Sequence, residues 1–449
     1  MELKRDIYAE LLAWKEADSH RVLELRGARQ VGKTFILDKF AKENYKIYLY
    51  INMAQTSGQE FLACLQKAAA WEPGMPRKAN PIHEAFTLFD GRFEDTKNTI
   101  IVIDEIQESA QVYSLIRQFA RDFTCHFVVT GSYLGKVLSK EYFQPVGDLD
   151  ILTLYTLSFE EFLDGLGRRE LFQKVDLYGR SPHAEYDELK AYYEIYTEIG
   201  GYPAVVKEYL ESHDLKHCKR QLQKVIGIFT EESQGYFDSV LDLNLFEEIL
   251  PAVAQTMLKE KKGSADLITD LSKIVYKQES NRITKKSIHQ AIAWLNRSHV
   301  IAFCHKANEC NVTDVTYNSR FYFLDVGVCR YFLDMAGADL STIRGLVREN
   351  FVYIDLLKRT AQMEIAGAAP MFGTYKEGEI DFLVNNRENY KTYGVEVKAG
   401  KSEGRTAAQL LNDQKVDSIY FLKGDTYGGI AERNITIPIY LVSRVSFDM

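Results

Sequence analysis

The segment Gly27-Ala-Arg-Gln-Val-Gly-Lys-Thr34 constrains the fold of this sequence more than any other feature. It fits the pattern GxxxxGK[ST], in which a lysine and a hydroxyl residue follow the second of two glycines. The apolar run Arg21–Arg26 before it predicts a strand, and Phe35–Phe40 after it predicts a helix. A strand, a glycine-rich turn and a helix in this order are the context that a phosphate-binding loop requires.

The residue types in this loop suit a nucleoside triphosphate. Glycines let the backbone curl so that its N–H groups face the phosphates at a helix N-terminus. Lysine then reaches the β and γ oxygens, and the threonine hydroxyl is a ligand for Mg²⁺. We therefore predict that ATP is bound by Gly27, Ala28, Arg29, Gln30, Val31, Gly32, Lys33 and Thr34. The alternative is a glycine turn that joins a strand to a helix and binds nothing.

A second group of polar residues follows the most apolar run, Thr99–Asp104. A carboxylate at the end of a buried strand needs a cation or a donor beside it, because its desolvation is costly. We expect Asp104 to help hold Mg²⁺ and Glu105 to polarise the attacking water as the general base. The next apolar run ends at Thr130-Gly-Ser132, and we expect Ser132 to lie beside the γ-phosphate. Two acids at a strand end without any catalytic role are the alternative.

The apolar runs divide the 449 residues into an α/β part, a helical part and a second α/β part. In the first part, Arg21–Arg26, Tyr45–Ile51, Thr99–Asp104 and His126–Thr130 are typical of parallel strands covered by helices on both faces. Helical periodicity begins at Ser158. Further strands are predicted at 321–324, 379–384, 393–398, 418–422 and 439–442. The length predicts two to four domains.

The net charge of −8 excludes attraction of DNA by the molecule as a whole. The segment from Lys259 to Arg297, however, contains nine basic and only four acidic residues. Helices are predicted at 249–258 and 264–274, a third helix begins with Thr284 as its N-cap, and a hairpin follows. This order is typical of a winged helix-turn-helix. Its third helix carries Lys285, Lys286 and His289, which would contact DNA, or would simply be solvated.

The chain shows no signal for secretion or for a membrane. Its N-terminus lacks a basic flank followed by an apolar stretch, and no apolar run approaches the length that spans a bilayer. The six cysteines have no CxxC pair or repeated spacing, which favours free thiols over disulfides or zinc. We therefore expect a cytoplasmic protein without membrane contact.

Five segments together resemble the prokaryotic AAA+ ATPases that carry a C-terminal DUF4143 region. These are Gly27–Thr34, Asp104-Glu-Ile-Gln107, Thr130-Gly-Ser132, Leu157-Ser-Phe-Glu-Glu-Phe162 and Gly200-Gly-Tyr-Pro203. The resemblance implies a P-loop AAA+ core at 1–157, a helical lid at 158–240, a winged helix-turn-helix at 241–335 and a PD-(D/E)XK nuclease-like α/β domain at 336–449. One departure is Gly147-Asp148, where the family often has Gly-Arg. An arginine that would contact the γ-phosphate is therefore missing there.

The nuclease pattern that the resemblance implies matches four residues of the tail. Asp381 and Glu396 would be metal ligands, Lys398 would orient or activate water, and Glu349 would complete the metal site from a helix. Glu396 and Lys398 are two residues apart and so project from the same face of their strand. Gln409 on the next helix would assist. Three interpretations remain open: a metal-dependent nuclease, a site that binds without cutting, and a purely structural cluster.

These expectations combine into a Mg²⁺-dependent ATPase coupled to a nuclease-like domain that interacts with DNA. The alternative is a nucleotide-switched regulator or adaptor whose tail binds without cleaving. A P-loop kinase is disfavoured, because no acceptor-binding subdomain is evident. Homo-oligomerisation is a further expectation, with Arg29, Arg117 and Arg121 as unranked candidates for phosphate or subunit contacts.

Overall fold

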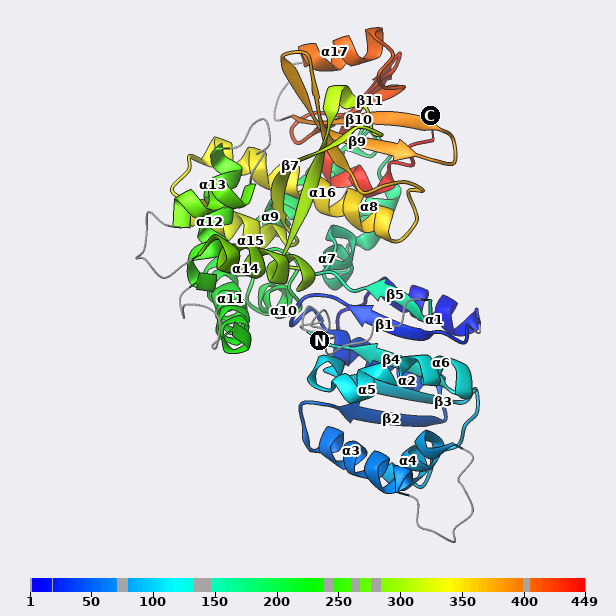
Figure 1. Cartoon of the computed structure of the whole chain (residues 1–449). Helices are drawn as coiled ribbons and strands as arrows, with labels where there is room; N and C mark the ends of the chain where they lie inside the picture. The colour runs from blue at the N-terminus through cyan, green and yellow to red at the C-terminus, as the bar shows by residue number, and fades with distance from the viewer. Residues whose placement is uncertain are drawn as a thin grey trace. The chain divides into compact units, whose positions relative to one another are not determined.

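The computed structural model describes residues 2–17, 19–70, 80–132, 147–237, 245–259, 267–275, 284–398 and 404–448 (Figure 1). The chain forms two compact units. We call Arg5–Leu154 the N-terminal unit, and Met1–Lys4 with Tyr155–Met449 the C-terminal unit.

The N-terminal unit contains one five-stranded sheet in the order β2-β3-β4-β1-β5, with all neighbours parallel. The carboxyl ends of all five strands therefore lie at one edge. The sheet strands are β1 (Val22–Arg26), β2 (Ile47–Asn52), β3 (Thr99–Asp104), β4 (His126–Thr130) and β5 (Leu149–Thr153). The helices are α1 (Ile7–Glu16), α2 (Lys33–Asn44), α3 (Thr56–Ala69), α4 (Pro81–Phe89), η1 (Ile106–Glu108), α5 (Ala110–Ser114) and α6 (Ile116–Asp122).

Every residue of β3 and β4 is buried, as expected for central strands of a parallel sheet with helices on both faces. On one face, Ile101 and Ile103 of β3 pack with Phe61 of α3, Phe86 of α4 and Phe119 of α6. The order of strands matters for the site, because β4 lies between β1 and β3. The four strands expected from the apolar runs of this unit are confirmed, and β5, a half-buried edge strand, was missed.

The C-terminal unit combines helices with a mixed eight-stranded sheet of order β12-β13-β11-β10-β9-β8-β6-β7. Its helices are α7 (Phe159–Gly165), α8 (Arg169–Lys174), α9 (His183–Ile199), α10 (Pro203–Ser212), α11 (Leu215–Phe237), α12 (Leu245–Lys259), α13 (Leu267–Val275), α14 (Lys285–Arg297), α15 (Val326–Met335), α16 (Leu340–Ala361) and α17 (Arg405–Asn412). Its strands are β6 (Ile301–Ala307), β7 (Val315–Phe323), β8 (Met371–Tyr375), β9 (Gly378–Asn386), β10 (Lys391–Lys398), β11 (Ser418–Lys423), β12 (Gly429–Ala431) and β13 (Asn434–Pro438).

The expected helices and hairpin of the middle part are present as α12, α13, α14 and the antiparallel pair β6–β7. Thr284 caps α14 by accepting a hydrogen bond from the N–H of Ser287. The hairpin is not separate from the tail, because β6 pairs with β8 through Lys306 and Ala307. One sheet therefore continues across the boundary that we expected between residues 335 and 336.

The expected strand at 439–442 is wrong, because residues Ile439–Arg444 form a 3₁₀ helix. Pro438 is the last residue of β13, where it pairs with Lys423. Each of the four residues 439–442 is buried. A short continuous apolar run does not distinguish a buried strand from a buried helical turn, which explains the error.

Two of the segments that carry the resemblance pack together in the C-terminal unit. The N–H of Leu157 donates to the carbonyl of Gly201 at 2.7 Å, and the hydroxyl of Tyr196 donates to the carbonyl of Leu157 at 2.6 Å. The N–H of Gly201 donates to the carboxylate of Asp325 at 2.8 Å. A Cβ atom on Gly201 would lie 2.2 Å from the carbonyl oxygen of Leu157. The Gly200–Pro203 segment thus has a structural role, since the backbones approach too closely for a side chain.

We predict that Gly201→Ala destabilises the protein by about 3 kcal/mol, because the new methyl group overlaps a backbone atom that is fixed by hydrogen bonds. Gly227→Ala in α11 is the matched control, since no atom lies within 4 Å of its added Cβ. In a helix interior this control should stabilise by up to about 1 kcal/mol. Denaturant unfolding of both variants measures the difference, and equal stabilities would contradict the packing argument.

Candidate functional site

The loop between β1 and α2 requires glycine at both of its ends. Gly27 has a φ of +146°, and a Cβ there would lie 2.2 Å from the carbonyl oxygen of Leu154. Gly32 has a φ of +97°, which L side chains rarely adopt, and the helix α2 begins at the next residue. The two glycines therefore allow the loop to close over the N-terminus of α2.

Lys33 lies inside this loop and is 6% exposed. Its ammonium donates hydrogen bonds of 2.9 Å to the carbonyl oxygens of Gly27 and Ala28. Burial lowers the pKa of Lys33 to about 8, and the nearby carboxylates of Glu105 and Asp104 oppose this shift. The lysine is thus a buried cation at the place where the loop would hold phosphate.

Asp104 links the loop to the strand β3. Its Oδ2 accepts hydrogen bonds of 2.8 Å from the hydroxyls of Thr34 and Tyr50. Its Oδ1 accepts the N–H of Glu105 at 2.8 Å, so both oxygens are satisfied by donors. Tyr50 comes from β2, and nothing in the sequence had marked it, because β2 and β3 pair only in the folded sheet.

Glu105 has a left-handed backbone, with a φ of +49°. Its carboxylate accepts a hydrogen bond of 2.6 Å from the side-chain amide of Gln107 and one of 3.3 Å from the N–H of Ser132. It also lies 3.8 Å from the guanidinium of Arg29. The structure thus brings Ser132 from the end of β4 to Glu105 from the end of β3. Thr130, by contrast, donates to the carbonyl of Leu25 within the sheet.

The three candidate arginines have different ion-pair partners, since Arg29 pairs with Glu105 and the other two pair with Asp148. Asp148 binds Arg117 and Arg121 through contacts of 3.2 Å. It directly precedes β5, whose first residue pairs with Val22, so it lies at the amino edge of the sheet. At about 3.3 Å per residue, β1 separates this edge from the loop by roughly 15 Å. Arg29 is therefore the one of the three that lies at the phosphate loop of its own chain, and a residue at 148 does not reach that loop.

Thr34 and Asp104 fit a Mg²⁺ ion, because a hydroxyl and a carboxylate are hard oxygen ligands and lie within hydrogen-bond distance of each other. In the described part of the chain, no group of three or more His, Cys, Asp or Glu side chains is arranged to hold a metal. In nucleotide sites, Mg²⁺ usually has one or two protein ligands, and phosphate and water complete its coordination.

The structure brings together the four predicted residues of the tail in the C-terminal unit. Lys398 lies 2.8 Å from the carboxylate of Glu396, and the N–H of Val397 donates to Asp381 at 2.7 Å. Burial, and next the charge of Asp381, raise the pKa of Glu396 to about 8. The same two causes raise the pKa of Glu349 to about 7. Asp381 is thus close enough to repel both glutamates.

Three residues of this cluster, Arg320, Tyr322 and Glu379, were not identified as site residues from the sequence. Arg320 lies between Glu379, at 2.8 Å, and Glu349, at 3.7 Å. The hydroxyl of Tyr322 donates to Glu349. Arg320 and Tyr322 come from β7, in the segment that we assigned to another domain, so the sequence pattern of the tail held no signal for them. Arg320 and Lys398 therefore neutralise carboxylates that we expected to bind a metal.

A cavity of about 400 Å³ opens beside this cluster. It is lined by Arg320, Tyr322, Glu349 and Glu379, and by Met257 and Leu258 of α12. Asp381, Glu396 and Lys398 are not among its described lining residues. Gln409 lies on α17, as expected.

The basic residues of α14 differ in their surroundings. The ammonium of Lys285 donates to the hydroxyl of Thr269 on α13. Lys286 and His289 are exposed on the same helix. Of the two lysines at the start of this helix, Lys286 is the one that does not bind Thr269.

No helix in the described ranges has both the length and the apolar character needed to cross a membrane. A search among curated proteins found no match. Residues 19–163 match a family described as an AAA domain, and residues 190–339 match a domain of unknown function, DUF8612. The second family differs from the DUF4143 region that the resemblance named.

Many solved structures are similar to the chain at low identity. A Walker-type ATPase of Pyrococcus abyssi is 16% identical, with a TM-score of 0.45, over 74% of this chain and 96% of that one. The ORC2 protein of Aeropyrum pernix is 12% identical, with a TM-score of 0.36, over 76% and 95%. The RuvB branch migration motor of Thermotoga maritima is 14% identical, with a TM-score of 0.28, over 67% and 89%.

Because these scores are all below 0.5, the assignment depends on the family matches, the strand order and the loop geometry. The AAA match covers the P-loop, the acids Asp104 and Glu105 at the end of β3, and the end of β4. The chain therefore combines a P-loop domain of the AAA type with a following segment, residues 190–339, that matches a domain of unknown function.

Proposed function

We propose that the N-terminal unit binds ATP with Mg²⁺ and hydrolyses it, with Glu105 as the general base. The observation that carries the proposal is the link from Thr34 to Asp104, with Lys33 in the loop and Glu105 one residue further. Lys33 and Thr34 begin α2, Asp104 ends β3 and Glu105 follows it, and this proximity at one edge of the sheet supports the proposed roles.

Each residue has a distinct role in this proposal. The backbone N–H groups of the loop and Lys33 bind the phosphates. Thr34 and Asp104 would hold Mg²⁺, which supplies charge stabilisation for the phosphoryl group. Glu105 accepts the proton of the attacking water, while Ser132 orients the carboxylate. Arg29 pairs with Glu105 and is within the loop, so it is our candidate for contact with the γ-phosphate.

For the tail, we propose that the carboxylate cluster belongs to a domain that binds nucleic acid or a partner and does not cleave nucleic acid. Arg320 and Lys398 already pair with Glu349, Glu379 and Glu396. A divalent cation would have to compete with both internal cations. The repulsion of Glu349 and Glu396 by Asp381 is the observation that favours the nuclease instead, since a metal would relieve it.

The proposal keeps a DNA contact through the exposed Lys286 of α14, and a cytoplasmic location. The location is supported by the six cysteines, none of which is paired in a disulfide.

We predict that Lys33→Ala abolishes ATP binding, because the buried cation that meets the phosphates is lost. Glu105→Gln should bind ATP and lower kcat at least about 100-fold, since the amide cannot accept the proton of the water. Glu108→Gln is the control, because this acid is nearby but exposed. Steady-state ATP hydrolysis and nucleotide titration measure these effects. Normal turnover by Glu105→Gln would exclude the general-base role.

The tail proposal predicts that Mg²⁺ and Mn²⁺ leave the thermal stability of the full chain unchanged when no nucleotide is present. The Lys33→Ala background removes binding at the P-loop, and cleavage of single-stranded and duplex DNA is assayed in parallel. A metal-dependent rise in the unfolding temperature, abolished by Asp381→Asn but not by Asp413→Asn, would support the nuclease and contradict our proposal. Asp413 is a suitable control because it is a carboxylate of the same unit that pairs with Lys376.

The DNA proposal predicts that Lys286→Glu weakens duplex binding several-fold and reduces its salt dependence, because a phosphate contact and its counterion release are lost. Lys224→Glu on α11 changes the net charge equally and should have little effect. Equal losses in the two variants would show that only the overall charge matters.

A further inference from the structure

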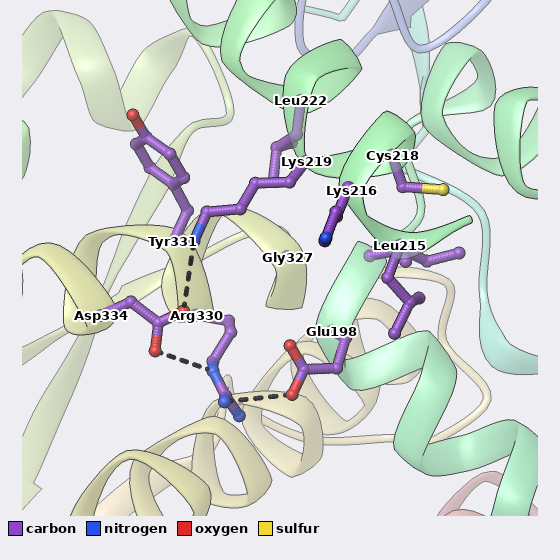
Figure 2. Close-up of a pocket in the computed structure, with 11 residues that line it drawn as sticks. Glu198, Leu215, Lys216, Cys218, Lys219, Leu222, Gly327, Arg330, Tyr331 and Asp334 are labelled. Carbon is purple, nitrogen blue, oxygen red and sulfur yellow. Dashed lines mark hydrogen bonds and ion pairs between the residues drawn. The ribbon is translucent and has the colours of Figure 1, made fainter. Parts of the chain in front are cut away.

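A second cavity, of about 180 Å³, lies in the C-terminal unit far along the sequence from the P-loop (Figure 2). Three helices form it: the end of α9, the first two turns of α11, and α15. Its lining residues lie between Glu198 and Asp334, so all of them belong to the segment that matches the domain of unknown function. Neither the ATPase nor the tail proposal uses them.

The inner wall of the cavity is apolar. Ile199, Cys218 and Leu222 are each at most 2% exposed. Burial raises the pKa of Cys218 to about 11, so its thiol is neutral at pH 7. Gly327 lies directly beside Ile199, because a Cβ on this glycine would be 2.5 Å from the carbonyl oxygen of Ile199. Such a wall favours the apolar body of a ligand.

The charged residues of the cavity differ in the ion pairs that they form. Arg330 is held between Glu198, at 3.0 Å, and Asp334, at 3.1 Å, and Lys219 lies 4.0 Å from Asp334 (Figure 2). Lys216, by contrast, is exposed, and its ammonium forms no hydrogen bond or ion pair with any residue that the structure describes, although it attracts the carboxylate of Asp214 electrostatically. Figure 2 shows this side chain directed toward the side of α15 that carries Gly327.

The lining therefore contains three cations and two carboxylates, and Lys216 supplies the excess positive charge. One unpaired ammonium suits a monoanion, whereas a phosphate dianion would need further donors. The volume limits the body of the ligand, since an apolar cavity of about 150 Å³ holds a benzene molecule.

We propose that this cavity binds a small carboxylate with an aromatic or branched aliphatic body, of roughly six to ten non-hydrogen atoms. The carboxylate pairs with Lys216, and the body lies against Ile199, Leu222 and Gly327. Bound ligand contacts α9, α11 and α15 together and so stabilises their packing. The proposal is independent of the ATPase assignment.

The test uses the full-length chain and a matched panel of probes. Benzoate and 3-methylbutanoate have both required features, benzamide lacks the charge, acetate lacks the body, and inorganic phosphate has the other anionic chemistry. Saturation-transfer NMR and thermal unfolding should show binding of benzoate or 3-methylbutanoate, with weaker effects of the other three. Absence of binding by both acids, or tighter binding of phosphate, would overturn the proposal.

Variants locate the binding on the structure. Lys216→Met should weaken binding of the acid about tenfold and leave the response to benzamide unchanged, since it removes a charge-assisted contact and keeps the apolar stem. Lys224→Met, on the same helix but outside the cavity, should have no effect. Leu215→Trp should block acid and amide alike without altering the fold, because Leu215 lines the mouth and is 45% exposed. Unchanged binding in Lys216→Met, or an equal loss in Lys224→Met, would contradict the assignment.

Discussion

The hydrogen bond from Thr34 to Asp104 is the interaction on which the candidate ATPase site depends. Thr34 lies at the start of α2, which follows β1, whereas Asp104 ends β3, and β4 separates these two strands in the sheet. Parallel pairing brings the ends of all three strands to one edge, and the glycine-rich loop turns the first residues of α2 toward that edge. The aspartate can therefore be buried at only 4% exposure, because hydroxyl and amide donors satisfy both of its oxygens.

The carboxylates of the tail, unlike Asp104, are neutralised by cationic side chains. Near the P-loop, Lys33 donates within the described part of the chain to the loop carbonyls of Gly27 and Ala28, which a phosphate can replace. In the tail, Arg320 is bound to two carboxylates and Lys398 to a third. Exchanging these partners for a metal means leaving a buried guanidinium without its counterions, which is costly. The cation near the P-loop is held by replaceable carbonyls, whereas the cations of the tail are held by carboxylates. For this reason we propose catalysis at the P-loop and binding without cleavage at the tail.

The sequence predicted those parts of the site that are local in the chain. The loop at 27–34 and the acids after β3 are each contained in a few consecutive residues, so their spacing alone indicated their roles. The contributions of Tyr50 and Arg320 could not be predicted, because they depend on which strands become neighbours. The location of Asp148 could not be predicted for the same reason, since the edge of the sheet at which it lies follows from the pairing of β5 with β1.

The fold shows the same distinction. Strands with strong apolar runs were found, whereas four strands whose sequences lack a long apolar run were missed: β5, β8, β12 and β13. The 3₁₀ helix at Ile439–Arg444 was mistaken for a strand because burial on all sides makes both look alike in sequence. The continuity of the sheet from β7 to β12 also depends on the pairing of β6 with β8, which joins residues far apart in the chain.

The affinity of the protein for ATP, measured with and without Mg²⁺ in the wild type and in Thr34→Val, tests the central claim most directly. Valine keeps the shape of threonine and removes only the hydroxyl that binds Asp104. Our account predicts that Mg²⁺ strengthens ATP binding in the wild type, and that Thr34→Val still binds ATP without metal but loses this gain. The same response to Mg²⁺ in both proteins would contradict the account.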